Sequence, residues 1–135
     1  MLAGPYTTMI LADLGAEVVK IEQPKIGDIT RNLLKDDPKY SLDGIGAYHL
    51  TLGRNKKSVE LNLKSEQGLK LFKELAEVAD VVVDNFSQGV TKRLGIDHQS
   101  LKEVNPKIIT CSISGFGNTE VNRPAYDNLI QGYAG

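Results

Sequence analysis

The sequence has one cysteine, no tryptophan and almost no excess of charge of either sign. Because Cys111 stands alone, neither a disulfide framework nor a zinc site built on cysteines is expected. A net charge of −1 creates no overall field that would recruit nucleic acid or a membrane surface. The apolar stretches fall far short of the ~20 residues that cross a bilayer. We therefore expect a protein of the reducing cytoplasm, with no nucleic-acid or membrane partner.

The chain does contain alternating strand and helix patterns along its 135 residues, about the length of one domain. Strands show as short β-branched or period-two runs, and helices as apolar residues spaced for one buried face. Strands are expected at 17–22, 58–63, 80–83 and 108–114, the third of them buried on both faces of a parallel sheet. Helices are expected through 9–14 with Thr7 or Thr8 as cap, at 65–79, after Asp97 to before Pro106, and at 125–134. Residues 89–94 are expected to form a short helical turn, and residues 47–52 either a short helix or an irregular segment.

Two segments do not fit this alternation. Residues 1–5 are expected to be the tail of a strand and a turn, so the first strand of the domain is expected to be missing. Residues 25–46 have no strong period and are expected to form a long surface loop, which is uncommon in a compact domain unless the loop has a role.

The repeated order of strand, helix and strand predicts a parallel sheet with right-handed crossovers. The expected fold class is therefore α/β: a Rossmann-like, mostly parallel sheet with helices on both faces, of which residues 1–135 form an incomplete part.

The carboxyl ends of parallel strands meet at one edge of the sheet, where such folds place ligands. Residues 21–24, 83–86 and 112–117 reach this edge. Asn85 offers amide hydrogen bonds and Phe86 an aromatic face, both suited to a purine or a pantetheine arm. A turn asparagine and a core phenylalanine are the alternative, which spacing alone favours.

Other candidates are weaker by themselves. The basic residues Arg54, Lys56, Lys57 and Lys64 could meet a phosphate, although a solvated surface is the more usual explanation of such a cluster. The turn at 115–117 lacks the third glycine of a dinucleotide fingerprint, and a tight turn with a core phenylalanine explains it equally well.

The remaining titratable residues do not form an obvious site. Tyr126 beside Asp127 could be a proton donor next to a carboxylate, or Asp127 could belong to the first turn of a helix. His49 has no paired ligand and His98 is expected to be an exposed helix residue, so no metal site is expected.

A series of short motifs follows these elements: LAGPY at 2–6, LADLGAEVVKIE at 11–22, GDITR at 27–31, RNKKS at 54–58, DNFSQG at 84–89, CSISGFG at 111–117 and RPAYD at 123–127. Their order and spacing resemble the N-terminal portion of the class III CoA-transferase family, which also contains the α-methylacyl-CoA racemases. One such motif is weak evidence, whereas the ordered series is highly specific.

The resemblance implies a site for a coenzyme A thioester and no metal. By position, the residues that match the family's CoA path are Leu61, Asn85, Phe86, Arg93 and Tyr126. Arg93 would meet a phosphate, and Phe86 the adenine or pantetheine region. Gln23 stands where some members carry a CoA-binding arginine, and Lys25 or Lys20 would have to replace that charge.

The resemblance also implies a chemistry. Transferases of the family pass CoA between carboxylic acids through an aspartate nucleophile, which falls beyond Gly135 here and is not Asp127. Racemases place a histidine where this chain has Tyr126, and a tyrosine with a pKa near ~10 is a poor proton acceptor. A transferase is therefore favoured over a 2-methylacyl-CoA racemase, and the chain alone is expected to be inactive.

Family members are longer than this chain and interlock as pairs of rings. The resemblance therefore implies a homo-oligomer, or a second chain that completes the domain. A non-catalytic CoA-binding module and a structural subunit are the alternatives from other classes. The motifs do not specify the acyl donor or the acceptor.

Overall fold

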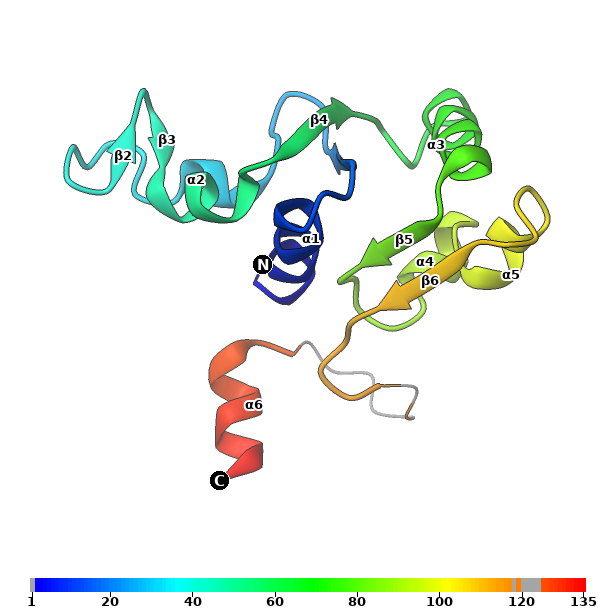
Figure 1. Cartoon of the computed structure of the whole chain (residues 1–135). Coiled ribbons are helices and arrows are strands. Elements are labelled where there is room, and N and C mark those ends of the chain that lie inside the picture. Colours follow the sequence, from blue (N-terminus) through cyan, green and yellow to red (C-terminus); the bar gives the residue numbers. More distant parts are fainter. Residues whose placement is uncertain (1, 118, 120–124) are drawn as a thin grey trace. The chain divides into compact units, whose positions relative to one another are not determined.

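The computed structural model describes residues 2–117, 119 and 125–135, which fall into two compact units, Met1–Leu69 and Lys70–Gly135. Figure 1 shows the elements of both units in chain order. The first unit contains α1 (Ala3–Asp13), β1 (Val18–Glu22), the 3-10 helix η1 (Ile29–Asn32), β2 (Ser41–Leu42), β3 (Ile45–Gly46), α2 (Ala47–Gly53) and β4 (Lys56–Glu60).

The first unit is built on a parallel pair of strands. β1 pairs with β4 in a register that runs from Val18 opposite Lys56 to Glu22 opposite Glu60. The antiparallel hairpin β2–β3 and helix α2 lie between these strands in the chain. Met9, Ala12 and Leu52 form the buried apolar core, and three polar residues are buried in the same unit: Glu22, Thr30 and His49.

The prediction for the start of the chain is wrong over its described part, because α1 begins at Ala3. Pro5 is the third residue of this helix, where a missing N–H costs nothing because the first-turn donors have no partner inside the helix. The hydroxyl of Thr8 donates to the carbonyls of Gly4 and Pro5, so Thr8 bonds back within the helix and does not cap it.

The long loop predicted at 25–46 is also wrong in part, because it contains η1 and the hairpin. The carboxylate of Asp28 accepts a hydrogen bond from the backbone N–H of Thr30 and so caps η1. A Cβ on Gly46 would lie 1.9 Å from the carbonyl oxygen of Leu33, so the hairpin packs directly on the backbone of the preceding segment.

The second unit contains most of α3 (Glu66–Val78), then β5 (Val81–Asp84), α4 (Val90–Leu94), α5 (His98–Lys102), β6 (Ile109–Ser112) and α6 (Asp127–Ala134). β5 and β6 run parallel and side by side, from Val81 opposite Ile109 to Asp84 opposite Ser112 (Figure 1). The buried apolar residues of this unit are Phe72, Ala76, Ile96, Leu101 and Ile108.

The fold class predicted from the sequence is confirmed, since both longer strand pairs are parallel and each is connected through helices. The predicted burial of the third strand on both faces is wrong, because Val81 is 41% exposed and β5 pairs only with β6 in the described part of the chain. Among the described residues, no helix has the length and apolar character that a membrane span requires.

Candidate functional site

A small pocket lies at the carboxyl ends of β5 and β6. It is lined by residues 85–88, residues 113–117 and Ala125. Its volume is about 50 Å³, room for a few water molecules, so it would hold one part of an extended ligand. This is the sheet edge at which the sequence predicts a ligand.

Asn85 and Phe86 come together in this pocket. The side-chain amide of Asn85 donates to the carbonyl oxygen of Ile113 at 2.6 Å, which fixes the amide and leaves its oxygen as an acceptor without a donor among the described residues. Phe86 is 42% exposed, so the alternative of a core phenylalanine is wrong. The pocket therefore offers a hydrogen-bond acceptor beside an aromatic ring.

The glycine turn forms the opposite wall. A Cβ on Gly115 would lie 2.0 Å from the Cβ of Ala125 and 2.9 Å from the Cδ1 of Ile130, so only glycine lets α6 pack on this turn. The ring of Phe116 meets the edge of Tyr133 at a centroid distance of 5.8 Å. Phe116 is half-buried and packs on Tyr133 at this turn, so the alternative of a tight turn with a core phenylalanine is correct for the turn and wrong for the core position.

Arg93 and Tyr126 do not line this pocket. Arg93 is exposed on α4, and its guanidinium has no partner in the described residues. Tyr126 is 66% exposed and precedes the first residue of α6. Asp127 is in the first turn of that helix and accepts from Gln131 at 2.7 Å. Arg123 and Pro124, the start of the last motif, lie outside the described residues.

Leu61, the fifth predicted site residue, belongs to the first unit. It is half-buried and follows β4, and its N–H donates to the carbonyl of Glu22 at 3.0 Å. Leu61 therefore extends the pairing of β1 and β4 by one bond, at the carboxyl ends of these strands.

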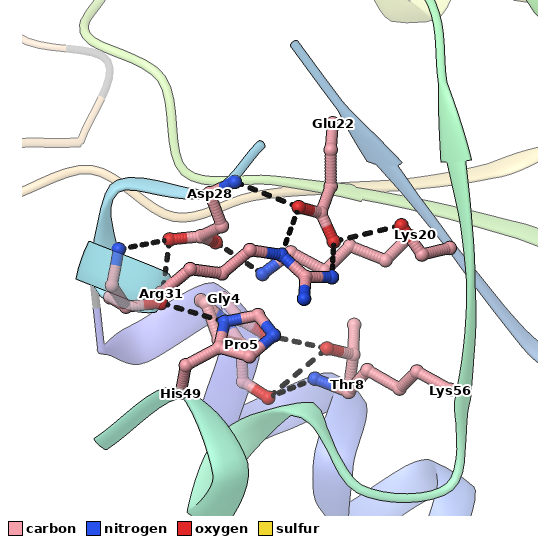
Figure 2. Close-up of polar contacts among 11 residues, drawn as sticks. Gly4, Pro5, Thr8, Lys20, Glu22, Asp28, Arg31, His49 and Lys56 are labelled. Carbon is pink, nitrogen blue, oxygen red and sulfur yellow. Dashed lines mark hydrogen bonds and ion pairs between the residues drawn. The ribbon is translucent and has the colours of Figure 1, made fainter. Parts of the chain in front are cut away.

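A polar network, absent from the sequence-based site, surrounds Glu22 at the same strand ends (Figure 2). The Glu22 carboxylate accepts from Arg31 through Nε at 2.8 Å and Nη2 at 2.7 Å. It also accepts from the N–H of Asp28 at 2.7 Å and the hydroxyl of Ser58 at 2.9 Å. Chiefly because of Arg31, and against the effect of burial, the pKa of Glu22 falls to about 2.

Asp28 connects this network to His49. Burial raises the pKa of Asp28, but the ion pair with Lys20 and the hydrogen bonds from Thr30 lower it to about 2. The hydroxyl of Thr30 donates its single hydrogen to Asp28 at 2.7 Å, because a carboxylate can only accept. Nδ1 of His49 lies 2.9 Å from the same hydroxyl oxygen and must therefore carry a hydrogen and donate it.

The remaining environment of His49 favours a neutral ring. His49 is 7% exposed, and burial, followed by the charges of Arg31 and Lys20, lowers its pKa. The sequence contains one local signal for this network: an aspartate two residues before a threonine is typical of a cap. Nothing in the local pattern indicates the pairs with Arg31 or His49.

The basic cluster at 54–57 is largely satisfied by its own unit. Arg54 pairs with Asp13 at 2.5 Å and Lys57 with Glu17 at 2.7 Å. Lys56 donates to the carbonyl of Pro5 at 2.7 Å, as Figure 2 shows. These contacts support the explanation of a paired surface over that of a phosphate site.

No group of three histidine, cysteine, aspartate or glutamate side chains that could hold a metal ion occurs in the described parts of the chain. His98 is exposed, as predicted, and its Nδ1 lies 3.1 Å from the hydroxyl of Thr110.

Comparison with known proteins gives a consistent result. The family model of CoA-transferase family III matches residues 1–135. Human succinyl-CoA:glutarate CoA-transferase is 42% identical over 137 residues, which cover 100% of this chain and 30% of that protein. Formyl-CoA:oxalate CoA-transferase of Escherichia coli O6:H1 is 39% identical, covering 98% of this chain and 32% of the enzyme.

Solved structures agree with these matches. The crystal structure of a CAIB/BAIF family protein from Brucella suis has a TM-score of 0.88 and 41% identity, and the match covers 98% of this chain and 35% of that one. A Mycobacterium tuberculosis protein matches with a TM-score of 0.88 at 33% identity, covering 99% of this chain and 36% of its own. The chain spans about a third of the length of these relatives.

Proposed function

The chain belongs to CoA-transferase family III, and on that premise we propose that it forms the coenzyme A-binding part of an enzyme that transfers CoA between carboxylic acids. The observation that carries the proposal is the pocket at the ends of β5 and β6, where the side-chain oxygen of Asn85, which has no donor among the described residues, lies beside the exposed Phe86. An aromatic face and a hydrogen-bond acceptor suit the adenine or the pantetheine amides of CoA.

We assign the other predicted residues to the same ligand. The guanidinium of Arg93, which has no partner among the described residues, is suited to a CoA phosphate, since a planar guanidinium donates two parallel hydrogen bonds to phosphate oxygens. Tyr126 offers a hydroxyl from the start of α6, and Leu61 an apolar contact at the end of β4. These roles remain proposals for each residue.

The proposed reaction is nucleophilic. An aspartate carboxylate attacks the thioester carbonyl and expels CoA thiolate to give a mixed anhydride, and the thiolate then forms an enzyme thioester as the first acid leaves. The acceptor carboxylate repeats these steps in reverse and leaves as the new acyl-CoA. We propose that this aspartate belongs to polypeptide outside residues 1–135, so that the chain binds CoA without turning it over.

Isothermal titration of the chain with CoA tests the binding proposal. Phe86→Ala should weaken CoA binding about tenfold, because base–aromatic stacking contributes about 1–3 kcal/mol. Val78→Ala on α3 is the matched control, since Val78 is an apolar residue 83% exposed, and it should bind as the unchanged chain does. If the unchanged chain releases no heat with CoA and succinyl-CoA does not compete, the chain is a structural subunit and the proposal is wrong.

Two assays separate the chemical alternatives. Succinyl-CoA incubated with glutarate and the chain should give no glutaryl-CoA, and turnover would contradict an external nucleophile. A 2-methylacyl-CoA incubated with the chain in deuterated water should gain no deuterium at C2. Deuterium incorporation would instead support the racemase alternative, with a residue other than a histidine at position 126 as its base.

We also propose that the chain self-associates or is completed by a second chain. Tyr6, Ile10 and Leu14 recur every four residues at α1, and they are 50%, 42% and 81% exposed. An apolar row of this kind is unfavourable in water unless another surface covers it. If the chain self-associates, sedimentation velocity should show oligomers at micromolar concentration, and a monomer at every concentration would refute self-association and favour a separate second chain.

A further inference from the structure

Two residues outside the pocket tie its walls together. β5 and β6 end in register at Asp84 and Ser112, and each wall of the pocket begins after one of these residues. The hydroxyl of Ser112 donates to Oδ2 of Asp84 at 2.5 Å, and the N–H of Phe86 donates to Oδ1 at 3.1 Å. One carboxylate thus holds the opposite strand with one oxygen and the Phe86 backbone with the other.

The neighbouring contacts leave Phe86 dependent on this carboxylate. The N–H of Ile113 donates to the carbonyl of Asp84 at 2.9 Å, and the Asn85 amide bonds to the carbonyl of Ile113. These bonds fix the strand ends and Asn85, but neither reaches Phe86. The ring of Phe86 is 42% exposed, so core packing does not fix it, and the bond to Asp84 is the one its backbone makes within the described residues.

We propose that Asp84 is a positioning residue that sets Phe86 against the glycine turn in the orientation that binds CoA. The inference rests on the proposed function of the pocket. Hydrogen bonds to a carboxylate are stronger than those between neutral groups, so a single side chain can order the segment before the ligand arrives. Binding then avoids the entropy cost of ordering an aromatic side chain and its backbone.

Because the chain has no tryptophan, a single introduced tryptophan reports on its own surroundings alone. Phe86→Trp introduces a single indole at the pocket and keeps an aromatic face for stacking. In this background Asp84→Ala should lower the fluorescence anisotropy of the tryptophan and weaken CoA binding by about three- to tenfold, within the range expected for one side chain that must be ordered on binding. Asp84→Asn should restore both values to within about twofold, because its oxygen accepts from residue 86 and its amide donates to Ser112.

Asp80→Ala is the matched control, because Asp80 precedes the opposite end of β5 and its carboxylate has no partner in the described residues. It should change neither anisotropy nor affinity. Ser112→Ala removes only the bond between the strands and should give an intermediate loss, so it serves as the test if Asp84→Ala does not fold. An anisotropy or a CoA affinity equal to that of Asp80→Ala would overturn the inference, if it is found in Asp84→Ala or, where that variant does not fold, in Ser112→Ala.

The two readouts separate this inference from the proposed function. If the unchanged chain does not bind CoA, the proposed function fails and the role of Asp84 in CoA binding fails with it. The anisotropy would still report whether Asp84 orders residue 86. If CoA binds and the anisotropy does not respond to Asp84→Ala, the proposed function stands and only the positioning role is wrong.

Discussion

The guanidinium of Arg31 binds the Glu22 carboxylate through two separate nitrogens, Nε at 2.8 Å and Nη2 at 2.7 Å, one to each oxygen. The Glu22 side chain is 2% exposed, whereas that of Arg31 is 33% exposed. The pair therefore joins a buried acceptor at the end of β1 to a donor that reaches solvent. This contact links the two ends of the segment between Glu22 and Arg31, which contains the turn at 23–27.

Loss of the Arg31–Glu22 pair should destabilise the folded chain. Arg31→Ala leaves a buried carboxylate with two of its four hydrogen bonds, and we expect the free energy of unfolding to fall by about 3 kcal/mol. Arg54→Ala is the control, because the Arg54–Asp13 pair is exposed and solvent screens its attraction, so its loss should change the free energy of unfolding far less. Urea denaturation measures both values, and equal losses would show that burial of Glu22 does not set the strength of its pair.

Acid should destabilise the first unit through three groups. The pKa of Glu22 and that of Asp28 are about 2 in the folded chain, below the values near ~4 of an unfolded chain. Their stabilisation is thus complete above pH ~4.5 and is lost as the pH falls towards 2. The pKa of His49 is also lowered, so its protonation favours unfolding below pH ~6.5.

Urea midpoints measured between pH 2 and 7 test whether the stability of the chain falls with falling pH. Glu22→Gln should reduce the slope between pH 4.5 and 2, because the amide does not titrate in that range. Glu103→Gln, at an exposed residue of the second unit, should leave the slope unchanged. A chain whose stability rises as the pH falls from 4.5 would contradict the pKa shifts of both carboxylates.

Lys25 should supply the charge that Gln23 lacks. Lys20 is held in its ion pair with Asp28, whereas the Lys25 ammonium is exposed and has no partner in the described residues. The backbone N–H of Lys25 donates to Glu60 at 3.2 Å, which holds the turn that carries this side chain.

A comparison of two ligands tests this assignment. Lys25→Gln should weaken the binding of CoA several-fold but not that of dephospho-CoA, because the lost contact is with the 3′-phosphate, which dephospho-CoA lacks. Lys35→Gln, another exposed lysine of the same unit, is the control for general charge effects. Equal losses for CoA and dephospho-CoA would place Lys25 elsewhere on the ligand, and no loss for either would remove it from the site.

Gly115→Ala should disturb the packing of α6. The new methyl would lie 2.0 Å from the Cβ of Ala125, so the helix must move, at a cost of about 1–3 kcal/mol. Gly132→Ala in α6 meets no atom within 4 Å and should stabilise the helix by about 0.5–1 kcal/mol. Thermal unfolding followed by near-ultraviolet circular dichroism, which reports on Phe116 and Tyr133, would detect both changes. A neutral Gly115→Ala would show that α6 does not rest on the turn.

The sequence predicted those parts of the fold that depend on the local spacing of apolar residues. The β-branched run at 81–83 and the apolar face of 66–78 identified β5 and α3, with boundaries off by about one residue. The predicted start of α1 was wrong because glycine before proline is typical of a turn. Proline is nevertheless tolerated in the first turn of a helix, where a backbone N–H has no hydrogen-bond partner inside the helix. Composition alone does not distinguish these two cases.

The candidate site was predicted only in part for a related reason. Asn85 and Phe86 follow a recognisable strand, so the strand-end rule placed them in the pocket. The CoA-binding roles of Arg93, Tyr126 and Leu61 came from the resemblance alone, since the sequence by itself offered Tyr126 only as a possible proton donor, and these roles stay predictions. The Glu22 network could not be found, because its partners lie on different elements and are matched by shape and charge rather than by spacing.

The orientation of the His49 ring has a consequence for a residue that carries no side chain. Since Nδ1 donates to Thr30, any incoming proton must bind at Nε2. A Cβ on Gly53 would lie 3.1 Å from that nitrogen. A methyl group introduced at residue 53 would therefore crowd the nitrogen at which the ring takes up its proton, without altering a single charge.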